Sequence, residues 1–556
     1  MATYKQYQRL IKVYKALSDL MKDLGFEAWL VGGLVRDLLL GLEPKDYDIV
    51  VNIPSISILK KALEKKWLGG YIVGDEAEVK NNLKNEVLKF RIVVDGIPED
   101  IDAVIPRIEE YDGITRKPKS VSYAGGLTVE ETLDRDSRRR DFTINALYLK
   151  LGLNIEELFA KSFYTKKGTI DKEHVSKFIV DPTGGLDMLK VWIDGKLETV
   201  LELTNDPRTV FGQDPLRMLR AIRFVATKGC ILSKNLKKAL YHNVDKFQVG
   251  TLISYERIEQ EISKILLKGT AESVIWAFEF MYKSRMLPLF LPELDKTWGF
   301  DQMNHHHDRD LWEHLFGVLE YVKKYPGSQS YGKMGLEPDV VSIFDVKKAK
   351  IDSYELCVFW AALLHDIAKP ETQLFNVKTQ EMVYYDHELK SSKMAVKILE
   401  KLKYSSDFAF ITAEIIKRHM LIKNFYSIVT KNGTVEASRS TMKKLRDKFI
   451  INFHGFRVDI MGLCIPVMAG DDMAKAEPSL NNFNTFIANW VRFINSESSR
   501  PQISRFKIDG LVVAKRYDLL PGKDLGEKIR KIKEFQITSD APNLEELLDE
   551  FDKKNS

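Results

Sequence analysis

The sequence has few cysteines, no long hydrophobic run and little net charge. Its three cysteines, Cys230, Cys357 and Cys464, stand far apart in apolar surroundings, which excludes a disulfide framework and a cysteine-rich zinc site. No run approaches the ~18 consecutive apolar residues of a membrane span. The N-terminus interleaves Lys and Tyr with Leu instead of forming an apolar signal core. We therefore expect a cytoplasmic protein without a membrane partner.

What is present indicates a multidomain globular protein. The 556 residues exceed what one hydrophobic core can organise, and 44% hydrophobic with 29% charged residues excludes a disordered or fibrous chain. Polar stretches at 325–335 and 496–502 are candidate boundaries or exposed loops. We expect four domains: a head at 1–150, a neck at 151–290, a helical domain at 291–495 and a basic helical tail at 496–556.

Strand signals are concentrated near the N-terminus. Short β-branched runs bounded by Gly, Pro or Asp predict strands at 28–31, 47–51, 90–94 and 101–105. After about residue 205, apolar residues recur at helical spacing. The fold class is therefore α+β, with an α/β head followed by mainly α-helical domains.

The net charge of +5 is unevenly distributed. Residues 501–535 hold nine Lys or Arg against five Asp or Glu, so most of the excess lies in the tail. Such a cluster can contact a phosphate backbone, although a solvated helix face would have the same composition.

The most informative segment of the head is 29–51. A predicted strand ends at Gly32-Gly33, where the backbone can approach a ligand, and the N-terminus of the following helix can hold phosphate oxygens. In the next strand Asp46 and Asp48 project from the same face and can share two divalent cations. Two-metal phosphoryl transfer needs this geometry.

A third carboxylate usually completes such a site from a neighbouring strand. Asp100 and Asp102 have the same side-chain direction in the run 99–105. We prefer Asp102 because it lies within the apolar run, and Asp100 is the substitute candidate. An isolated Asp-x-Asp is usually a polar turn. The ordered series of Gly-Gly, helix, Asp-x-Asp and carboxylate strand favours a metal site instead.

A basic cluster at 138–147 suits nucleotide recognition. The forked donors of Arg139 and Arg140 suit phosphate, while Asp141 and Asn145 can read a ribose hydroxyl.

The segment 213–224 predicts a helix that opens with an acid near its N-terminus and a proline in its first turn. Asp214 and Arg217, at i and i+3, could form a salt bridge. They could also read a base, because an acceptor beside a forked donor can hydrogen-bond both C and A. Both interpretations remain open from the residues alone.

Together these segments resemble the ordered motifs of class II tRNA nucleotidyltransferases, the CCA-adding enzymes, and of the related bacterial poly(A) polymerases. The resemblance covers about 27–290 and implies a polymerase-β-like nucleotidyltransferase head followed by neck, body and tail. The matching segments are 31–37, 46–48, 139–146, 181–185 and 214–224, with 254–261 resembling the neck motif.

The resemblance implies addition of CCA to tRNA 3′ ends from CTP and ATP, with release of pyrophosphate and no nucleic-acid template. Two Mg²⁺ would be held by Asp46, Asp48 and Asp102, and Asp214 with Arg217 would select C and A. The implied nucleotide-binding residues also include Gly32, Gly33, Arg36, Arg139, Arg140, Asp141, Asn145, Asp181, Arg220 and Arg223.

Two departures from the family pattern are visible. Gln213 stands where the family usually has Glu, which could change the orientation of Arg217. An insertion at about 154–179 and a long link from 185 to 213 have no function readable from the sequence.

Histidine is concentrated in the second half of the chain, with nine of ten beyond residue 240. Histidines and carboxylates brought from several helices to one centre suit a hydrolytic site holding a transition metal or Mg²⁺. The series resembles the HD phosphohydrolase domain that is fused to some bacterial CCA-adding enzymes. The resemblance implies a core ligand set of His314, His365, Asp366 and Asp471, with His387 and His419 nearby.

Asp472 and Asp459 are alternatives for the last ligand, and we expect His305-His306-His307 to form an exposed turn beside the site. The segment 508–529 resembles the tail module of the HD-fused enzymes. Apolar residues repeated at helical spacing from 544 to 551 predict core packing.

Two alternative functions remain open. One is a poly(A) polymerase that adds A tails to RNA, and the other is an RNA-binding HD phosphohydrolase whose polymerase site has decayed.

Overall fold

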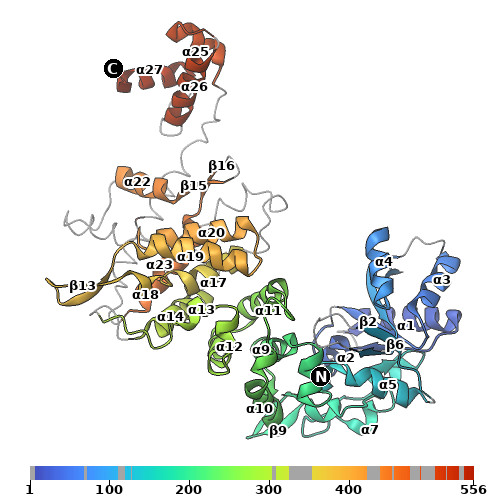
Figure 1. Ribbon diagram of the computed structural model, residues 1–556. Helices are drawn as coiled ribbons and strands as arrows, with labels where there is room; N and C mark the ends of the chain where they lie inside the picture. Colours follow the sequence, from blue (N-terminus) through green and yellow to red (C-terminus); the bar gives the residue numbers. More distant parts are fainter. Residues whose placement is uncertain are drawn as a thin grey trace. The chain divides into compact units, whose positions relative to one another are not determined.

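The computed structural model (Figure 1) describes residues 7–44, 46–67, 72–110, 119–126, 128–303, 309–324, 354–421, 439–453, 456–475, 489, 508–520, 522–536 and 544–555. The chain forms two compact units. The first contains the described residues up to 420 and those from 463 to 475, and the second contains the others.

A six-stranded sheet in the order β3-β4-β2-β1-β7-β8 forms the centre of the head. β2 and β4 run parallel, whereas the other neighbouring pairs run antiparallel. The four predicted strands are confirmed, with the last ending one residue early. The bounds are β1 Ala28–Val31, β2 Tyr47–Val51, β3 Val87–Val94, β4 Ile97–Val104, β7 Tyr148–Lys150 and β8 Ile179–Val180.

The β3–β4 half of this sheet has one apolar face and one polar face. Leu88 and Phe90 of β3 and Ala103 of β4 are buried on the apolar face. Because side chains alternate along a strand, Lys89 and Asp102 lie on the opposite face. The carboxylate predicted on β4 is therefore directed away from the hydrophobic core.

Helix α5 (Val129–Arg138) packs against the central strands. Its Leu133 is fully buried in a cluster with residues of β1, β2 and β7. A capping box between Thr128 and Glu131 begins the helix. The other helices and turns of this region are α1 Gln8–Leu24, α2 Gly33–Leu39, α3 Ile56–Trp67, α4 Glu76–Lys84, η2 Thr143–Asn145, α6 Ile155–Phe159, α7 Lys172–Val175 and η3 Gly185–Met188.

The segments without a readable function are integral to the head. The insertion at 154–179 contains α6 and α7 and leads into β8, the edge strand that pairs with β7. The link from 185 to 213 contains short strands and a helix. Small strand pairs in this unit are β5 Arg107–Glu110 with β6 Ser120–Tyr123, β9 Val191–Ile193 with β10 Lys196–Glu198, and β11 Val200–Leu201 with β12 Ile231–Leu232.

The helix predicted within 213–224 is confirmed as α9 (Leu216–Lys228), with Pro215 as its N-cap and Asp214 just before it. Helix α8 ends at Gln213, and α9 begins at Leu216. Asp214 is extended, because the residue before a proline disfavours the helical region and Pro215 cannot donate a backbone hydrogen bond. The neck elements are α8 Pro207–Gln213, α9 Leu216–Lys228, α10 Lys234–His242, η4 Val244–Lys246, α11 Tyr255–Lys268, α12 Ala271–Lys283, η5 Leu287–Leu289 and α13 Pro292–Asp295.

A helical domain follows the neck within the same unit. The Tyr404 hydroxyl lies 2.7 Å from the Ser263 hydroxyl of α11 and accepts a hydrogen bond from Trp360. A hairpin, β13 Gln373–Asn376 with β14 Glu381–Tyr384, interrupts the predicted helical pattern. The helices are α14 Leu311–Lys324, α17 Tyr354–Leu364, α18 Lys369–Thr372, α19 His387–Lys401, α20 Ser406–Arg418 and α23 Met461–Met473.

The second unit contains a helix with a hairpin and a group of tail helices. The predicted tail packing is confirmed, because Leu547, Leu548 and Phe551 are buried in one cluster with Val513 and Ile532. Its elements are α22 Arg439–Phe449, β15 Ile450–Phe453, β16 Phe456–Asp459, α25 Gly510–Tyr517, α26 Lys523–Gln536 and α27 Leu544–Asn555.

Part of the basic tail has a structural use. Arg516 pairs with Asp549 and Asp552, which ties α25 to α27, and Lys528 lies 3.9 Å from the centre of the Tyr517 ring. Arg505, Lys507 and the side chain of Lys533 lie outside the described residues, as do the loops at 325–335 and 496–502.

The four domain boundaries stay a prediction. No described helix combines the length and apolar character needed to cross a membrane.

The turn at 181–185 packs tightly against the segment 143–145. A Cβ atom on Gly185 would collide with the backbone carbonyl of Thr143. Two backbone N–H groups, of Gly185 and Leu186, donate to the carboxylate of Asp181 and hold the turn in place.

We predict that Gly185→Ala destabilises the head by about 1–3 kcal/mol, because the backbone must move to admit the methyl group. The Gly212→Ala variant is the matched control. A Cβ at Gly212, inside α8, meets nothing within 4 Å, so helix propensity should leave its stability equal or slightly higher. Thermal melting of both variants checks the difference, and equal melting temperatures would contradict the steric argument.

Candidate functional site

The predicted carboxylates of the head meet where β2 and β4 run side by side. Asp48 and Asp102 are register partners across this parallel pair, and Asp46 lies just before β2. Lys89 is the register partner of Asp102 on the other side, in β3. The sheet therefore places Lys89, Asp102 and Asp48 in one row on its polar face.

The electrostatics of these carboxylates suit a cation. Burial and then the neighbouring Asp102 raise the pKa of Asp48 to about 6. Burial also raises the pKa of Asp102, with Asp46 adding to the shift and Lys89 opposing it. Carboxylate oxygens are the ligands that Mg²⁺ prefers, and a divalent ion would relieve their mutual repulsion.

Asp100, the substitute candidate, has a partner of its own. Arg91 donates to both of its carboxylate oxygens, at 2.5 and 3.0 Å. This contact lowers the pKa of Asp100. The geometry therefore favours Asp102 as the third carboxylate.

Gly32 brings the end of β1 against the carboxylates. Its φ of 79° and ψ of −138° are readily adopted only by glycine, and a Cβ there would lie 3.5 Å from Asp48 Oδ2. Gly33 opens α2, whose Arg36 is buried and donates to Asp37 and to Asn145. The predicted Gly-Gly motif thus lies at the site, and Arg36 ties it to the segment 143–145.

Two cavities adjoin the carboxylates, and Asp46 and Asp48 line both. The smaller, of about 420 Å³, also contacts Lys89, Arg91 and Asp102. The larger, of about 570 Å³, is rich in arginine. Its lining residues are Gly32, Gly33, Arg36, Asp46, Asp48, Arg139, Arg140, Asp141, Asn145, Asp214, Arg217, Arg220, Arg223, Phe224, Lys228 and Arg257.

A buried carboxylate that sequence reasoning missed holds two of these arginines. Asp136 has no exposed surface and accepts hydrogen bonds from Arg139 at 2.8 Å and from Arg140 at 3.0 Å. The Tyr148 hydroxyl donates to it at 2.8 Å. Burial opposes ionisation, but the two guanidinium groups lower the pKa of Asp136 to about 2. Its i, i+3 and i, i+4 spacing to the arginines was the available sequence signal.

A second ion pair links the head to the neck. The carboxylate of Asp141 accepts from Asn145 at 3.0 Å and from Arg220 of α9 at 2.5 and 2.9 Å. Burial opposes its charge, yet Arg220 and Asn145 hold the pKa of Asp141 well below its usual range. Arg223, one turn further along α9, pairs with Glu261. These arginines thus have fixed positions along the cavity wall.

The two predicted base-reading residues lie on the same wall, each held by different partners. Arg257 of α11 donates to both oxygens of Asp214, at 2.8 and 2.6 Å. Arg217 donates to Gln213 Oε1 at 2.9 Å and to the backbone carbonyl of Arg139. Gln213 therefore does orient Arg217, as the departure from the family pattern suggested.

One predicted nucleotide-binding residue is placed elsewhere. Asp181 is not among the described residues that line the cavity, and its carboxylate accepts the two backbone hydrogen bonds that fix the 181–185 turn. In contrast, Phe224, Lys228 and Arg257 line the cavity although they were not predicted. Phe224 and Arg257 belong to segments that matched family motifs, so their positions were visible but their contacts were not.

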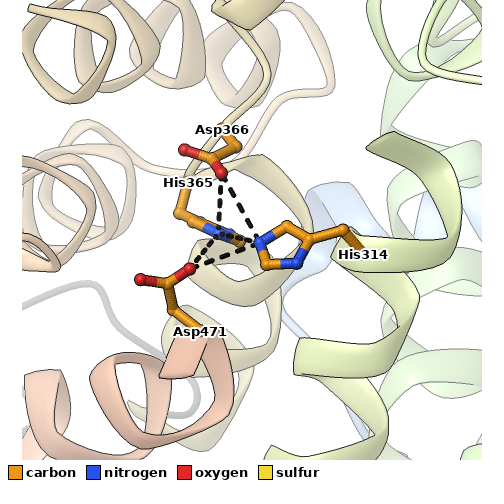
Figure 2. Close-up of side chains that lie close together, drawn as sticks. All are labelled: His314, His365, Asp366 and Asp471. Carbon is orange, nitrogen blue, oxygen red and sulfur yellow. Dashed lines mark hydrogen bonds and ion pairs between the residues drawn. The ribbon is translucent and has the colours of Figure 1, made fainter. Parts of the chain in front are cut away.

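A second cluster of side chains lies inside the helical domain (Figure 2). Nε2 of His314 lies 3.3 Å from Nε2 of His365, 3.3 Å from Asp471 and 3.5 Å from Asp366. Ligand atoms of all four residues lie within 4.8 Å of one another, and all four are buried. In the described part of the chain, the carboxylates of the head form no group this close.

Asp366 belongs to a second group as well. Its Oδ1 lies 3.0 Å from Nε2 of His387 and 3.6 Å from Nε2 of His419, and these three ligand atoms also lie within 4.8 Å of one another. Its Oδ2 is directed at His314 and His365. Oδ1 of Asp366 and Nε2 of His419 are buried without a hydrogen-bond partner. Two possible metal-binding groups therefore share one carboxylate.

Backbone carbonyls orient these histidine rings. Nδ1 of His365, His387 and His419 lies within 2.6–2.9 Å of the carbonyl three residues earlier in the chain. Because a carbonyl can only accept, Nδ1 carries a proton, and Nε2 of each ring faces the cluster. Burial opposes the shift, but the neighbouring Asp366 raises the pKa of His365 to about 9 and also raises the pKa of His387. Burial and then the neighbouring His365 lower the pKa of His419 to about 3, which keeps this ring neutral.

The alternative ligands are less well placed. Asp472 pairs with Lys475 at 3.0 Å and is in neither group. The side chain of Asp459 and the segment His305-His306-His307 lie outside the described residues. Lys369, not predicted, is buried with its Nζ 2.7 Å from Asp366 Oδ2.

Comparison with known proteins assigns both regions. Residues 28–191 match the family model of the poly A polymerase head domain, and residues 311–449 match that of the HD domain. An A-adding tRNA nucleotidyltransferase of Deinococcus radiodurans is 23% identical over 518 residues, covering 92% of each chain. A multifunctional CCA protein of Aromatoleum aromaticum is 25% identical over 402 residues, covering 71% of this chain and 74% of its own.

Among solved structures, the Bacillus stearothermophilus CCA-adding enzyme in complex with CTP has the same fold. It matches with a TM-score of 0.54 and 16% identity, covering 99% of this chain and 98% of its own. The α+β fold class predicted from the sequence is therefore confirmed.

We predict that Asp136→Ala destabilises the head by about 3–5 kcal/mol, because two largely buried guanidinium groups lose their shared counter-charge. Asp134→Ala is the matched control on the same helix. It breaks only the exposed pair with Arg138 and should cost at most about 0.5 kcal/mol. Urea denaturation measures both, and similar midpoints for the two variants would refute a central role for Asp136.

Proposed function

The chain belongs to the CCA-adding tRNA nucleotidyltransferase and poly(A) polymerase family, with a fused HD domain, and we propose that it adds CCA to the 3′ ends of tRNA. The observation that carries this proposal is the row of Asp102 and Asp48 at the edge of an arginine-lined cavity that also contains Asp214 and Arg217. That cavity combines sites for metal, triphosphate and base within one unit.

In the proposed reaction, the 3′-hydroxyl oxygen of the tRNA bonds to the α-phosphorus of CTP or ATP. The bond between the α-phosphorus and the oxygen that bridges it to the β-phosphate breaks, and pyrophosphate leaves. Arg139 and Arg140 bind phosphate oxygens, and Asp136 keeps their forks aimed at the cavity. Asp141 and Asn145 lie at the cavity wall, where they meet the ribose of the incoming nucleotide.

Asp46, Asp48 and Asp102 would hold two Mg²⁺ ions, which supply neutralisation of the leaving group and a lower pKa for the attacking hydroxyl. The donor set fits this role because three carboxylates adjoin, and because burial and the neighbouring Asp102 raise the pKa of Asp48. The protein contributes their alignment, which depends on the register of β2 and β4.

For base selection, Asp214 presents an acceptor and Arg217 a donor from neighbouring positions of the neck. Asp214 can accept from the amino group on C4 of cytosine or on C6 of adenine, where U and G carry a carbonyl oxygen instead. Arg257 keeps Asp214 ionised, because its two hydrogen bonds contribute to a lowered pKa that burial alone would raise. Asp214 can thus act as an acceptor at neutral pH.

Addition of A alone is the second candidate. The relative that spans 92% of the chain is an A-adding enzyme, and Gln213 holds Arg217 through a neutral amide where the family usually has a carboxylate. A neutral partner restrains the Arg217 guanidinium less strongly than a carboxylate would. The guanidinium orientation that suits C can then differ in stability from the orientation that suits A.

The deciding experiment uses tRNA transcripts ending before C, after C and after CC, together with an unstructured RNA. Each is incubated with CTP, with ATP and with both nucleotides, and the 3′ ends are sequenced. We expect CCA on the first transcript. Extension of only the CC-ending transcript would identify an A-adding enzyme, long A tails on every RNA would identify a poly(A) polymerase, and no extension would identify a decayed site.

Asp48→Ala should lower the extension rate by at least about 10³-fold, because one of the three carboxylates proposed to hold the Mg²⁺ ions is lost. Asp100→Asn is the matched control, since Asp100 lies on the same sheet face but is paired with Arg91. Its rate should stay within about twofold of the parent. A large loss of extension rate in Asp100→Asn, with no loss in Asp102→Asn, would identify Asp100 instead of Asp102 as the third carboxylate of the site.

We also propose that the HD domain binds divalent metal ions and hydrolyses a phosphoester, such as a 2′,3′-cyclic or a terminal phosphate. The shared Asp366 and the unpartnered Nε2 of His419 support this proposal. His314, His365, Asp366 and Asp471 would hold one ion, and Asp366 with His387 and His419 could hold another. Bound ions of this kind supply a water molecule with a lowered pKa.

We predict that His365→Ala loses bound metal and all cyclic-phosphate hydrolysis, while its tRNA extension persists. The exposed His242 provides the control variant His242→Ala, which should retain both. Mass spectrometry of the dialysed protein measures metal content independently of activity. Hydrolysis that persists in His365→Ala, or that needs no added metal, would refute this ligand set.

A further inference from the structure

The smaller cavity of the head shares its carboxylates with the site described above, but no ligand has yet been assigned to its interior. Asp46, Asp48 and Asp102 line it together with residues of β3 and the start of β4, among them Lys89 and Arg91. Its volume of about 420 Å³ suffices for one nucleotide residue but not for a folded domain. It is a separate space that meets the arginine-rich cavity at the Asp46–Asp48 pair, because no other described residue lines both.

In an in-line transfer, the two cavities would hold different reacting groups. The attacking oxygen and the leaving pyrophosphate must lie on opposite sides of the α-phosphorus. The pyrophosphate belongs with the arginines of the larger cavity, which supply its counter-charges. The attacking hydroxyl must therefore lie away from these arginines, and the smaller cavity is a second space that adjoins the same carboxylates.

The end of an RNA chain carries an anionic phosphodiester next to its terminal ribose, so the carboxylates there would repel it without a cation. Two basic side chains lie in the cavity. Arg91 is engaged by both oxygens of Asp100. Lys89 has its Nζ 3.9 Å from Asp102, beyond hydrogen-bond distance, and its side chain is 42% exposed.

We propose that the smaller cavity binds the 3′-terminal nucleotide of the RNA and that Nζ of Lys89 contacts its terminal phosphodiester. The proposal rests on the nucleotidyl transfer proposed above. Lys89 is a positioning residue, because it lies in the same row as Asp102 and Asp48 and so sets the distance between the RNA end and the catalytic carboxylates.

Steady-state kinetics of Lys89→Gln test this assignment. We expect the KM for tRNA to rise roughly tenfold, which is typical of a lost charge-assisted hydrogen bond, with the KM for ATP and CTP and the kcat within about twofold. Lys89→Arg should restore most of the affinity. Lys80→Gln is the control, since Lys80 is exposed on α4 and lines neither cavity.

A modified RNA makes the test specific for one phosphate. An acceptor-stem RNA whose last linkage is a neutral methylphosphonate should bind the parent protein as weakly as unmodified RNA binds Lys89→Gln. The two changes should not add, because both remove the same contact. Fluorescence anisotropy without nucleotide measures these affinities, so the result does not depend on turnover.

Three outcomes would overturn the proposal. Additive losses would place Lys89 against another phosphate. A rise in the KM for nucleotide instead of tRNA would assign the cavity to the triphosphate or pyrophosphate. Unchanged RNA affinity in Lys89→Gln would remove Lys89 from the RNA site. Failure of the parent protein to extend any RNA would instead refute the proposed function, and the binding measurement would still decide the role of Lys89.

Discussion

The parallel pairing of β2 with β4 is the contact on which the head depends. It is the one parallel pair in an otherwise antiparallel six-stranded sheet, and its register sets Asp48 beside Asp102. A shift by one residue would turn the carboxylates into the hydrophobic core and the core residues Ile101 and Ala103 outward. Burial of the apolar face therefore holds the carboxylate face in register, so one strand pairing specifies both the stability of the sheet and the geometry of the proposed metal site.

Charge balance organises the other wall of the nucleotide cavity. Asp136, Asp141, Asp214 and Glu261 each hold at least one arginine of the lining in a fixed position. An arginine-rich pocket without these partners would lose side-chain order through mutual repulsion. Removing any one of these acids would lower the stability of the protein, because it would leave a buried or half-buried arginine without its ion-pair partner. This is also why a protein that binds nucleotides can have a net charge of only +5.

The sequence predicted the strands, the carboxylate pair and the HD residues, because each depends on local alternation or on a motif within a few positions. Asp136 and Arg257 were missed, since their importance comes from partners brought together by the fold. The start of α9 was predicted, because Pro215 after Asp214 carried the signal, whereas the preceding helix α8 was not predicted. Spacing alone could not decide between Asp471 and Asp472. Their helix decides it by turning Asp471 to the histidines and Asp472 to Lys475.

The possible metal-binding groups of the HD domain contain side chains from His314 to Asp471, which are far apart in the chain. A chain emerges from the ribosome N-terminus first, so the head can be complete long before the last of these ligands is synthesised. His314, His365 and Asp366 must therefore exist for a time as an incomplete set with an exposed interior. During synthesis the head can thus fold first, and the histidine cluster of the HD domain is completed last.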